Sequence, residues 1–386
     1  MLINGERALA YVVTIDEIKP IDGYDRVEYA RTNGWWVIIS KKDNLKVGDK
    51  CVYFEVDSRV PDTDERFAFL EAKHYKIKTQ RMCKVYSQGL LMPLSLFPEL
   101  GDVQVNTDVT QRLGVAYAVA EDNARKRNQN KDAKYNAMAA RHKRLFRLKL
   151  FRKMMKTKWG KKILFLFFGR KKDKPLAFPD FVKKTDEERI ENCPWHIGDG
   201  KKYVLTEKLD GTSCTYALRR NKFGKFEFYV CSRNIRQMNE NQKTYHDHNI
   251  YWDLAFKYNI EQHLKDYLMM HKDYEWVYIQ GEGVGSVQGN PLKLQEDDLY
   301  VFNFVTSNDG RIGSIEGSEL IAEWGMKWVP ILGIDTLQDN LEDLKVFADG
   351  KSAVNSDVMR EGIVYRSLDG KDSFKNVSRK YLMKHG

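Results

Sequence analysis

The residues best suited to covalent chemistry lie in a short run around Lys208. In Thr206-Glu207-Lys208-Leu209-Asp210-Gly211, a lysine ends an apolar stretch and is followed at once by a carboxylate and a turn glycine. A lysine amine is a weak nucleophile at neutral pH because it is protonated, and it becomes reactive when its pKa is lowered. Lys208 is therefore a candidate nucleophile. The same pattern is also typical of an ordinary strand that ends in a surface turn.

Further short motifs follow Lys208 in order, each at or beside the end of a predicted strand. They supply two cations, two carboxylates and an aromatic ring: Ser232-Arg233-Asn234, Gly281-Glu282-Gly283, Leu299-Tyr300-Val301-Phe302, Arg360-Glu361-Gly362-Ile363-Val364 and Ser373-Phe374-Lys375. Arginine binds phosphate through two hydrogen bonds, carboxylates hold hydrated divalent ions, and an aromatic ring stacks on a base. Such a set can bind a nucleoside triphosphate. The glycines beside Glu282 predict a turn there rather than a phosphate-binding loop.

As an ordered set, these motifs resemble those of the covalent nucleotidyltransferases, the superfamily of ATP-dependent polynucleotide ligases and messenger RNA capping enzymes. DNA ligases and capping enzymes carry an OB barrel after the last motif. Here the candidate barrel comes first, as in the RNA ligases with an N-terminal OB domain. Segments similar to that branch are Trp35-Trp36-Val37-Ile38, residues 47–58, Ser87-Gln88-Gly89-Leu90 and residues 184–189. The resemblance covers about 1–115 and 178–384.

This resemblance implies a three-step reaction. Lys208 attacks the α-phosphate of ATP, expels pyrophosphate and becomes a lysyl–AMP phosphoramidate. AMP then passes to the 5′-phosphate of an RNA end, and a 3′-hydroxyl attacks that phosphate, releases AMP and seals the strand. Lys375 is expected to neutralise the α-phosphate and, with the metal, to lower the pKa of Lys208.

The resemblance also implies which residues hold ATP and metal. The expected ATP-binding residues are Glu207, Lys208, Arg233, Glu282, Phe302, Glu361 and Lys375. Phe302 is expected to stack on adenine, and Arg233 to reach the phosphates or the RNA end. Asp210, Glu282 and Glu361 are expected to position Mg²⁺ or Mn²⁺, mainly through bound water, because Mg²⁺ sheds water reluctantly.

Other interpretations of single residues stay open. Asp210 could cap its turn, Phe302 could belong to the core, and Glu361 could be a surface carboxylate. Related ligases often have Lys-x-Lys in the last motif, whereas Val377 stands at the second lysine here. Contacts to the leaving pyrophosphate are in doubt for this reason, with Lys380 or the metal as substitutes.

The fold class expected from these elements is α+β. Residues 1–115 predict an OB-type β-barrel, with short strands at 8–13, 26–30, 35–39, 50–56 and 84–93. Residues 177–386 predict a nucleotidyltransferase domain of antiparallel sheets and helices. Its strands are expected at 203–207, 212–219, 225–231, 276–280, 299–305, 362–366 and 374–377, with one helix after Thr185 and another over 249–271.

The positive charge is confined to one segment between the two domains. Residues 125–174 hold 20 Lys and Arg against two Asp, whereas the rest of the chain holds 44 basic and 52 acidic residues. We expect 120–176 to be a basic helical insertion or linker. Packing on a neighbouring element, binding of nucleic acid and contact with an anionic membrane are all compatible with it.

The favoured function is an ATP-dependent RNA ligase in RNA repair, with RNA ends or a nicked RNA-containing duplex as its substrate. Alternatives are a DNA-nick ligase, another nucleotidyltransferase, or a non-catalytic nucleic-acid-binding protein with a decayed site. We expect a monomer that works with separate end-healing enzymes and not on a membrane. Its five scattered cysteines and the lack of a signal sequence favour the cytoplasm, or the nucleus in a eukaryote.

Overall fold

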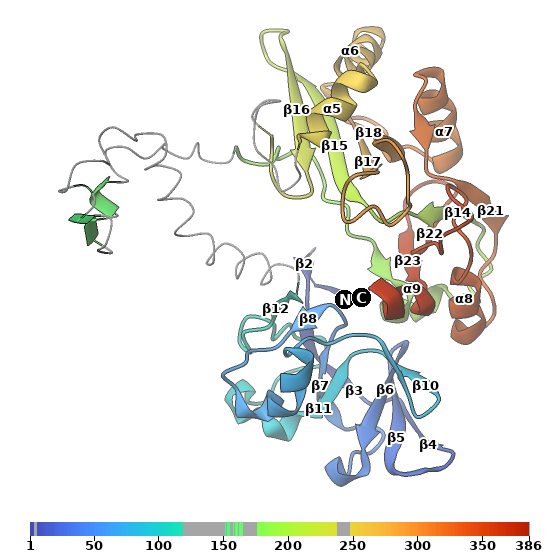
Figure 1. Ribbon diagram of the computed structural model, residues 1–386. Coiled ribbons are helices and arrows are strands. Elements are labelled where there is room, and N and C mark those ends of the chain that lie inside the picture. Colours follow the sequence, from blue (N-terminus) through green and yellow to red (C-terminus); the bar gives the residue numbers. More distant parts are fainter. Residues whose placement is uncertain are drawn as a thin grey trace. The chain divides into compact units, whose positions relative to one another are not determined.

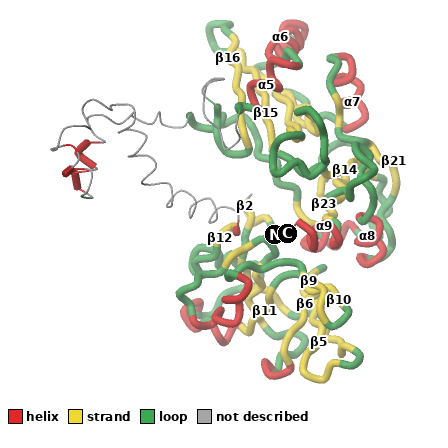
Figure 2. Tube along the Cα trace, viewed as in Figure 1, coloured by secondary structure: helices red, strands yellow, loops and turns green. Residues whose placement is uncertain are grey.

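A computed structural model describes residues 1–3, 6–118, 176–237 and 248–385, together with a few residues between 151 and 164. The chain divides into two compact units. Figures 1 and 2 show its helices and strands. One unit comprises Met1–Val56, Ile77–Leu113 and Pro175–Gly386, and the other comprises Asp57–Lys76 and Gly114–Lys174. The prediction of a basic helical insertion falls almost wholly outside the described residues.

Two three-stranded antiparallel sheets form the N-terminal barrel. One has the order β11-β7-β3 and the other β4-β5-β6. Their bounds are β3 Ala10–Thr14, β4 Glu17–Ile21, β5 Tyr24–Thr32, β6 Trp35–Ser40, β7 Lys50–Phe54 and β11 Leu90–Pro93. Residues that alternate inward, such as Trp35, Val37 and Ile39, pack in one apolar core. The predicted OB-fold domain is confirmed.

The strand expected over 84–93 is in fact two. β10 (Val85–Ser87) pairs with β9 (Gln80–Met82), and β11 pairs with β7. The break lies at Gly89, whose φ of 96° favours glycine, and a Cβ there would lie 2.5 Å from the ring of Tyr53. The Tyr53 hydroxyl donates a hydrogen bond to the Gln88 carbonyl, which fixes this break against the core.

The remaining elements before residue 119 are short. β1 (Leu2–Ile3) pairs with β2 (Glu6–Arg7), and single 3-10 turns occupy Lys41–Asp43, Leu94–Leu96 and Pro98–Leu100. In the second unit, β8 (Ser58–Arg59) pairs with β12 (Ala116–Tyr117). The 3-10 helix η2 covers Glu65–Lys73 and is capped by the Asp64 side chain, which accepts from the Arg66 amide.

Two sheets build the C-terminal domain. The six-stranded sheet has the order β16-β15-β17-β18-β19, with β20 beside β18, and the five-stranded sheet has the order β13-β23-β22-β14-β21. Their bounds are β13 Glu188–Arg189, β14 Tyr203–Lys208, β15 Thr212–Arg220, β16 Phe226–Ser232, β17 Trp276–Val284, β18 Asp298–Thr306, β19 Gly310–Arg311, β20 Lys327–Trp328, β21 Ile331–Asp335, β22 Gly362–Ser367 and β23 Ser373–Val377. The mixed α+β class is confirmed.

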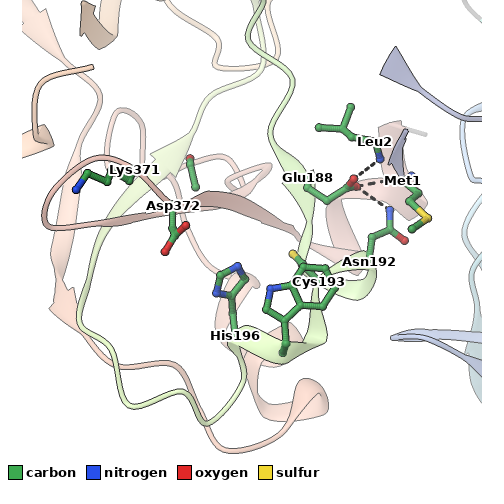
Figure 3. A pocket seen from close by; sticks show the side chains of 10 residues that line it. Met1, Leu2, Glu188, Asn192, Cys193, His196, Lys371 and Asp372 are labelled. Carbon is green, nitrogen blue, oxygen red and sulfur yellow. Dashed lines mark hydrogen bonds and ion pairs between the residues drawn. The ribbon is translucent and has the colours of Figure 1, made fainter. Parts of the chain in front are cut away.

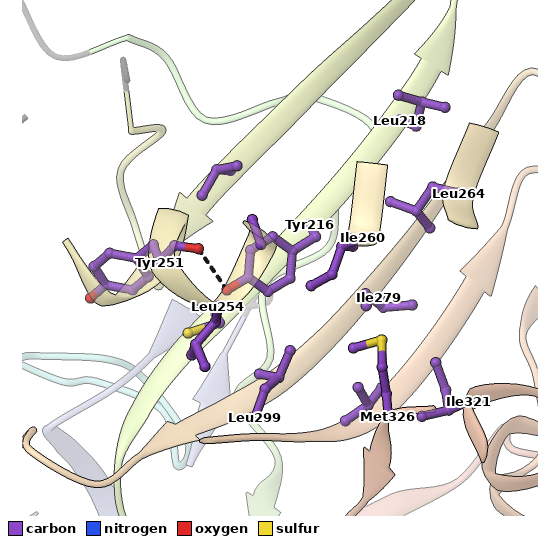
Figure 4. Packing of buried hydrophobic residues seen from close by; sticks show 14 of the residues in the cluster. Tyr216, Leu218, Tyr251, Leu254, Ile260, Leu264, Ile279, Leu299, Ile321 and Met326 are labelled. Atoms are coloured by element: carbon purple, nitrogen blue, oxygen red, sulfur yellow. Dashed lines mark hydrogen bonds between the residues drawn. The ribbon is translucent and has the colours of Figure 1, made fainter. Parts of the chain in front are cut away.

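Helices pack on these sheets. They are α5 Ile250–Lys257, α6 Ile260–Met270, α7 Ser314–Glu323, α8 Leu341–Ala348 and α9 Arg379–His385. Leu254 of α5, Leu264 of α6 and Ile321 of α7 are buried with Tyr216 and Ile279 of the six-stranded sheet (Figure 4). No helix among the described residues has both the length and the apolar composition to cross a membrane.

Two helix predictions were wrong. The single helix expected over 249–271 is divided at Asn259, which adopts a left-handed conformation (φ 46°) between α5 and α6. The helix expected after Thr185 is replaced by β13 and the 3-10 turns η6 (Ile190–Asn192) and η7 (Pro194–His196). β13 pairs in parallel with β23, so hydrogen bonds to a strand far along the chain override the local capping signal.

Candidate active site

Lys208 is the last residue of β14. This strand lies between β22 and β21, and Lys208 is in register with Gly362 of β22. Glu361 immediately precedes β22, so its carboxylate reaches Lys208, and Oε2 lies 2.6 Å from the lysine Nζ. Burial alone would lower the pKa of Lys208, but the carboxylates of Glu361, Glu282 and Asp210 raise it above the ordinary value.

The expected lowering of the Lys208 pKa was assigned to Lys375 together with the metal, and the direction here is that of the protein's own groups. Among the protein's own groups the three carboxylates prevail, so Lys208 is held as an ammonium paired with Glu361. Its conversion to a nucleophile therefore requires a further positive charge that offsets the carboxylates.

Glu282 lies inside β17, so the predicted turn at Gly281–Gly283 was wrong. The strand continues to Val284, with a register shift between Gln280 and Gly281. The glycines allow close packing, because a Cβ at Gly281 would lie 2.7 Å from the Tyr300 carbonyl oxygen and one at Gly283 would lie 2.9 Å from the Cys214 sulfur. Burial raises the pKa of Glu282 to about 8.

Asp210 follows β14 and is held by the C-terminal helix. The Tyr381 hydroxyl, on α9, donates a hydrogen bond to Oδ2 of Asp210. Helix α9 directly follows β23, the strand of Lys375, and the Ser378 hydroxyl accepts from the Tyr381 amide. Sequence reasoning missed Tyr381, since a tyrosine in a short terminal helix carries no motif.

Lys375 lies in the middle of β23 and is mostly buried. Its Nζ is 3.1 Å from Oδ1 of Asp186, and burial lowers its pKa to about 8. Arg233, just beyond β16, places a guanidinium nitrogen 3.2 Å from Oδ2 of the same Asp186. Asp186 was not predicted as a site residue. The only sequence signal was its place in the segment 184–189, which resembles the approach to the nucleophile.

Phe302 is half-buried on β18. Its ring packs with Leu209, Val284 and Val329, so it belongs in part to an apolar cluster. The guanidinium of Arg366 lies 5.7 Å from the ring centre and donates to the Phe302 carbonyl oxygen. Phe302 is thus fixed from one side by an arginine of the five-stranded sheet.

Glu207 precedes the candidate nucleophile, and its side chain extends from the opposite face of β14. Its Oε2 accepts a hydrogen bond from the Ala353 amide at 2.7 Å. Its Oε1 is buried and has no hydrogen-bond partner within the part of the chain that the structure describes. Burial raises the pKa of Glu207, opposed by the Ser352 side chain and the Ala353 amide, and Oε1 can accept a further hydrogen bond from water or a ligand.

Val377 stands where related ligases often have a second lysine, and Lys380 was expected as one of its substitutes. Val377 is buried at the end of β23, where its side chain belongs to the domain interior. Lys380 is largely exposed, and its Nζ lies 3.3 Å from Asp349. The described contacts of Lys380 therefore do not include the site.

Known proteins were compared with this sequence and fold. A model of the RNA ligase family matches residues 201–382, and a model of an OB-fold domain matches residues 9–94. The solved structure of a Naegleria gruberi RNA ligase with pyrophosphate is 29% identical and has a TM-score of 0.74. The match covers 98% of this chain and 99% of that one. The C-terminal part of the chain, residues 201–382, therefore belongs to the RNA ligase family.

Mutants of the same Naegleria ligase give equivalent matches. One with AMP and manganese and one with ATP and manganese are each 29% identical with a TM-score of 0.72, covering 98% of this chain and 99% of that one. No curated protein sequence matches the chain.

The donor set of this ligase fits a hydrated divalent cation. Burial raises the pKa of Glu282 and of Glu361, and the nearby Asp210 carboxylate raises both further, a repulsion that a cation would relieve. Among the described residues, no group of three His, Cys, Asp or Glu is arranged to hold an ion directly. Because Mg²⁺ keeps several of its waters, contact through bound water stays the prediction for these three carboxylates.

A separate pocket of about 350 Å³ lies beside β13 and β23 (Figure 3). Its lining residues are Met1, Leu2, Glu188, Asn192, Cys193, Trp195, His196, Lys371, Asp372 and Ser373. Of the residues in the ordered motifs described above, only Ser373 lines this pocket. The charged side chains in its lining are two carboxylates, Glu188 and Asp372, and one lysine, Lys371. This lining offers few cations for a triphosphate, and it is distinct from the cluster around Lys208.

Proposed function

We propose that this RNA ligase seals 3′-hydroxyl and 5′-phosphate RNA ends through lysyl–AMP and RNA-adenylate intermediates. One observation carries the proposal: Lys208 ends β14 in contact with Glu361, electrostatically coupled to Glu282, Asp210 and Lys375. A lysine placed among carboxylates and beside a buried cation is suited to attack a phosphate.

ATP would be held by the residues that the motifs identify. Phe302 offers a ring face for adenine, and the unsatisfied Oε1 of Glu207 can accept a hydrogen bond from the adenine amino group. Lys375 and Arg233 would bind phosphate oxygens. Mg²⁺ or Mn²⁺ would sit at Asp210, Glu282 and Glu361 through water, as the carboxylate set favours.

In the first step, Nζ of Lys208 forms a bond to the α-phosphorus while the bond from that phosphorus to the pyrophosphate oxygen breaks. Lys208 must first lose a proton, and Glu361 Oε2 is in place to accept it. When bound, the divalent ion supplies positive charge that weakens the hold of the carboxylates on this proton. Lys375 neutralises charge that develops on the α-phosphate oxygens.

The substrates beyond ATP are RNA ends. We propose that separate end-healing enzymes prepare them, and that the ligase acts as a monomer in the cytoplasm or nucleus. The described cysteines are all free thiols, which suits a reducing compartment.

The test is covalent labelling with α-labelled ATP and Mg²⁺ or Mn²⁺, run beside α-labelled GTP and resolved on a denaturing gel. We expect an acid-labile, base-stable adduct with ATP that is absent from Lys208→Ala. The adduct should be present in Lys202→Ala, a control at an exposed lysine that directly precedes β14. Labelling that survives in Lys208→Ala would refute the assignment of the nucleophile. Sealing of a nick with an all-DNA strand as fast as RNA would refute the choice of substrate.

A further inference from the structure

Two cations that the proposed function assigns to phosphates contact one carboxylate of the protein. Oδ1 of Asp186 lies 3.1 Å from Lys375 Nζ, and Oδ2 lies 3.2 Å from an Arg233 guanidinium nitrogen. Each oxygen of this carboxylate thus binds a different cation. Two negatively charged oxygens of a phosphate could contact the same two cations in the same way, one oxygen to each cation.

The backbone holds Asp186 firmly in this position. It lies just before β13, where Arg189 is in register with Lys375 of β23. The next residue, Glu187, lies 3.4 Å from nitrogens of both Arg366 and Arg311 and so anchors the segment from its other side. Asp186 is therefore not a mobile surface carboxylate that meets Lys375 by chance.

The surroundings of Lys375 make an anion necessary. Its pKa is lowered by burial and further by Arg7, Arg189 and Lys208, while Asp186 is the group that most opposes this lowering. The pKa of Asp186 is itself held below its ordinary value by Lys375, Arg233 and Arg7, against the effect of burial. Without Asp186, the buried Lys375 ammonium would lose the carboxylate that pairs with it, whereas Arg7 and Lys208 keep Glu55 and Glu361.

On the basis of the proposed function, we propose that Asp186 is an internal counter-ion that holds Lys375 and Arg233 in place until phosphate oxygens displace it. Asp186 is then a positioning residue that competes with the nucleotide. Its return to Arg233 would favour release of pyrophosphate after the first step, whereas the α-phosphate beside Lys375 stays bonded to Lys208. The affinity for a phosphate group then depends on how much more strongly Lys375 and Arg233 bind it than they bind the Asp186 carboxylate.

This predicts an increase in affinity when the carboxylate is removed. In Asp186→Asn, the magnesium complex of the unreactive analogue α,β-methylene-ATP should bind about tenfold tighter at pH 7, which corresponds to about 1.4 kcal/mol. Pyrophosphate with magnesium should show the same sign. Asp186→Glu, which keeps the charge, should stay near the wild-type affinity, and so should Asp180→Asn, because the Asp180 side chain is 88% exposed.

Isothermal titration calorimetry measures these affinities, and denaturant unfolding shows that each variant is folded. If Asp186→Asn does not fold, Asp186→Ser leaves room for water in the same place, and the same increase in affinity for the analogue is expected. Binding that is weaker or unchanged in the folded variants would overturn the proposal, since a carboxylate that only orients Lys375 would weaken binding when lost. A wild-type protein that binds no analogue and forms no AMP adduct would instead refute the proposed function, and this proposal with it.

Discussion

Lys345 is expected to contribute more to stability than any exposed lysine, and its replacement by methionine tests how the last motif is held. Its Nζ lies 2.7 Å from Oε1 of Glu191 and donates a hydrogen bond at 2.8 Å to the Val377 carbonyl. The side chains of Lys345 and Glu191 are 0% and 1% exposed. The contact joins α8 and η6 to the end of β23, two residues beyond Lys375.

The magnitude follows from this burial. Removing one partner of a buried ion pair leaves the other charge without compensation and typically costs about 3–5 kcal/mol. We expect a loss in this range for Lys345→Met at pH 7. Replacing both partners, in Lys345→Met with Glu191→Leu, should recover most of the loss, because an apolar pair of similar volume is often neutral or stabilising.

The pH dependence has a definite sign. Although burial opposes it, Lys345 keeps the pKa of Glu191 below the ordinary value of 4.5, so in the wild type the stability from Glu191 is present above pH 4.5 and lost as the pH falls further. In Lys345→Met we expect the pKa of the buried Glu191 to be raised, so the loss of unfolding free energy grows as the pH rises above 4.5. The difference in unfolding free energy between the wild type and the variant should therefore become smaller at acidic pH.

Urea unfolding followed by tryptophan fluorescence measures the free energy of unfolding, with equal m-values required for comparison. Lys380→Met is the matched control. That lysine pairs with Asp349 but is 61% exposed, so its loss should cost no more than about 1 kcal/mol. A loss below about 1 kcal/mol in Lys345→Met, or a double variant less stable than the single one, would refute this reasoning.

Three further predictions concern the ligands. Because burial lowers the pKa of Lys375 to about 8, affinity for an unreactive ATP analogue should fall as the pH rises through 8. The arginine of Lys375→Arg stays charged, so the affinity of that variant should not change over this range. A wild-type affinity that is constant up to pH 10 would contradict this prediction. Tyr381→Phe frees the Asp210 carboxylate, so the Mn²⁺ concentration for half-maximal labelling should rise about tenfold with the ATP requirement unchanged. Phe302→Ala should weaken analogue binding by about 1–3 kcal/mol while Phe302→Tyr retains it, and equal affinity in all three proteins would limit Phe302 to a packing role.

The sequence alone was sufficient for much of the fold. The alternation over Trp35–Ile39 and the apolar run that ends at Lys208 predicted β6 and β14 within a residue. In such strands, the polarity of each side chain and its position in the alternation indicate whether it is buried. The order of the motifs likewise identified the family and the nucleophile candidate. These are local signals, and the strands that carry them keep their local preference in the folded protein.

Contacts between distant segments could be known only from the tertiary structure. Asp186 meets Lys375 because β13 pairs with a strand nearly 190 residues later, and that pairing also replaced the helix expected after Thr185. Glu282 lies within a strand because its flanking glycines fit against neighbouring strands, not because they turn the chain. Tyr381 reaches Asp210 from a terminal helix without any motif. Sequence determined which groups are available for chemistry, and packing decided their partners, since charge and burial at a site depend on every element that closes around it.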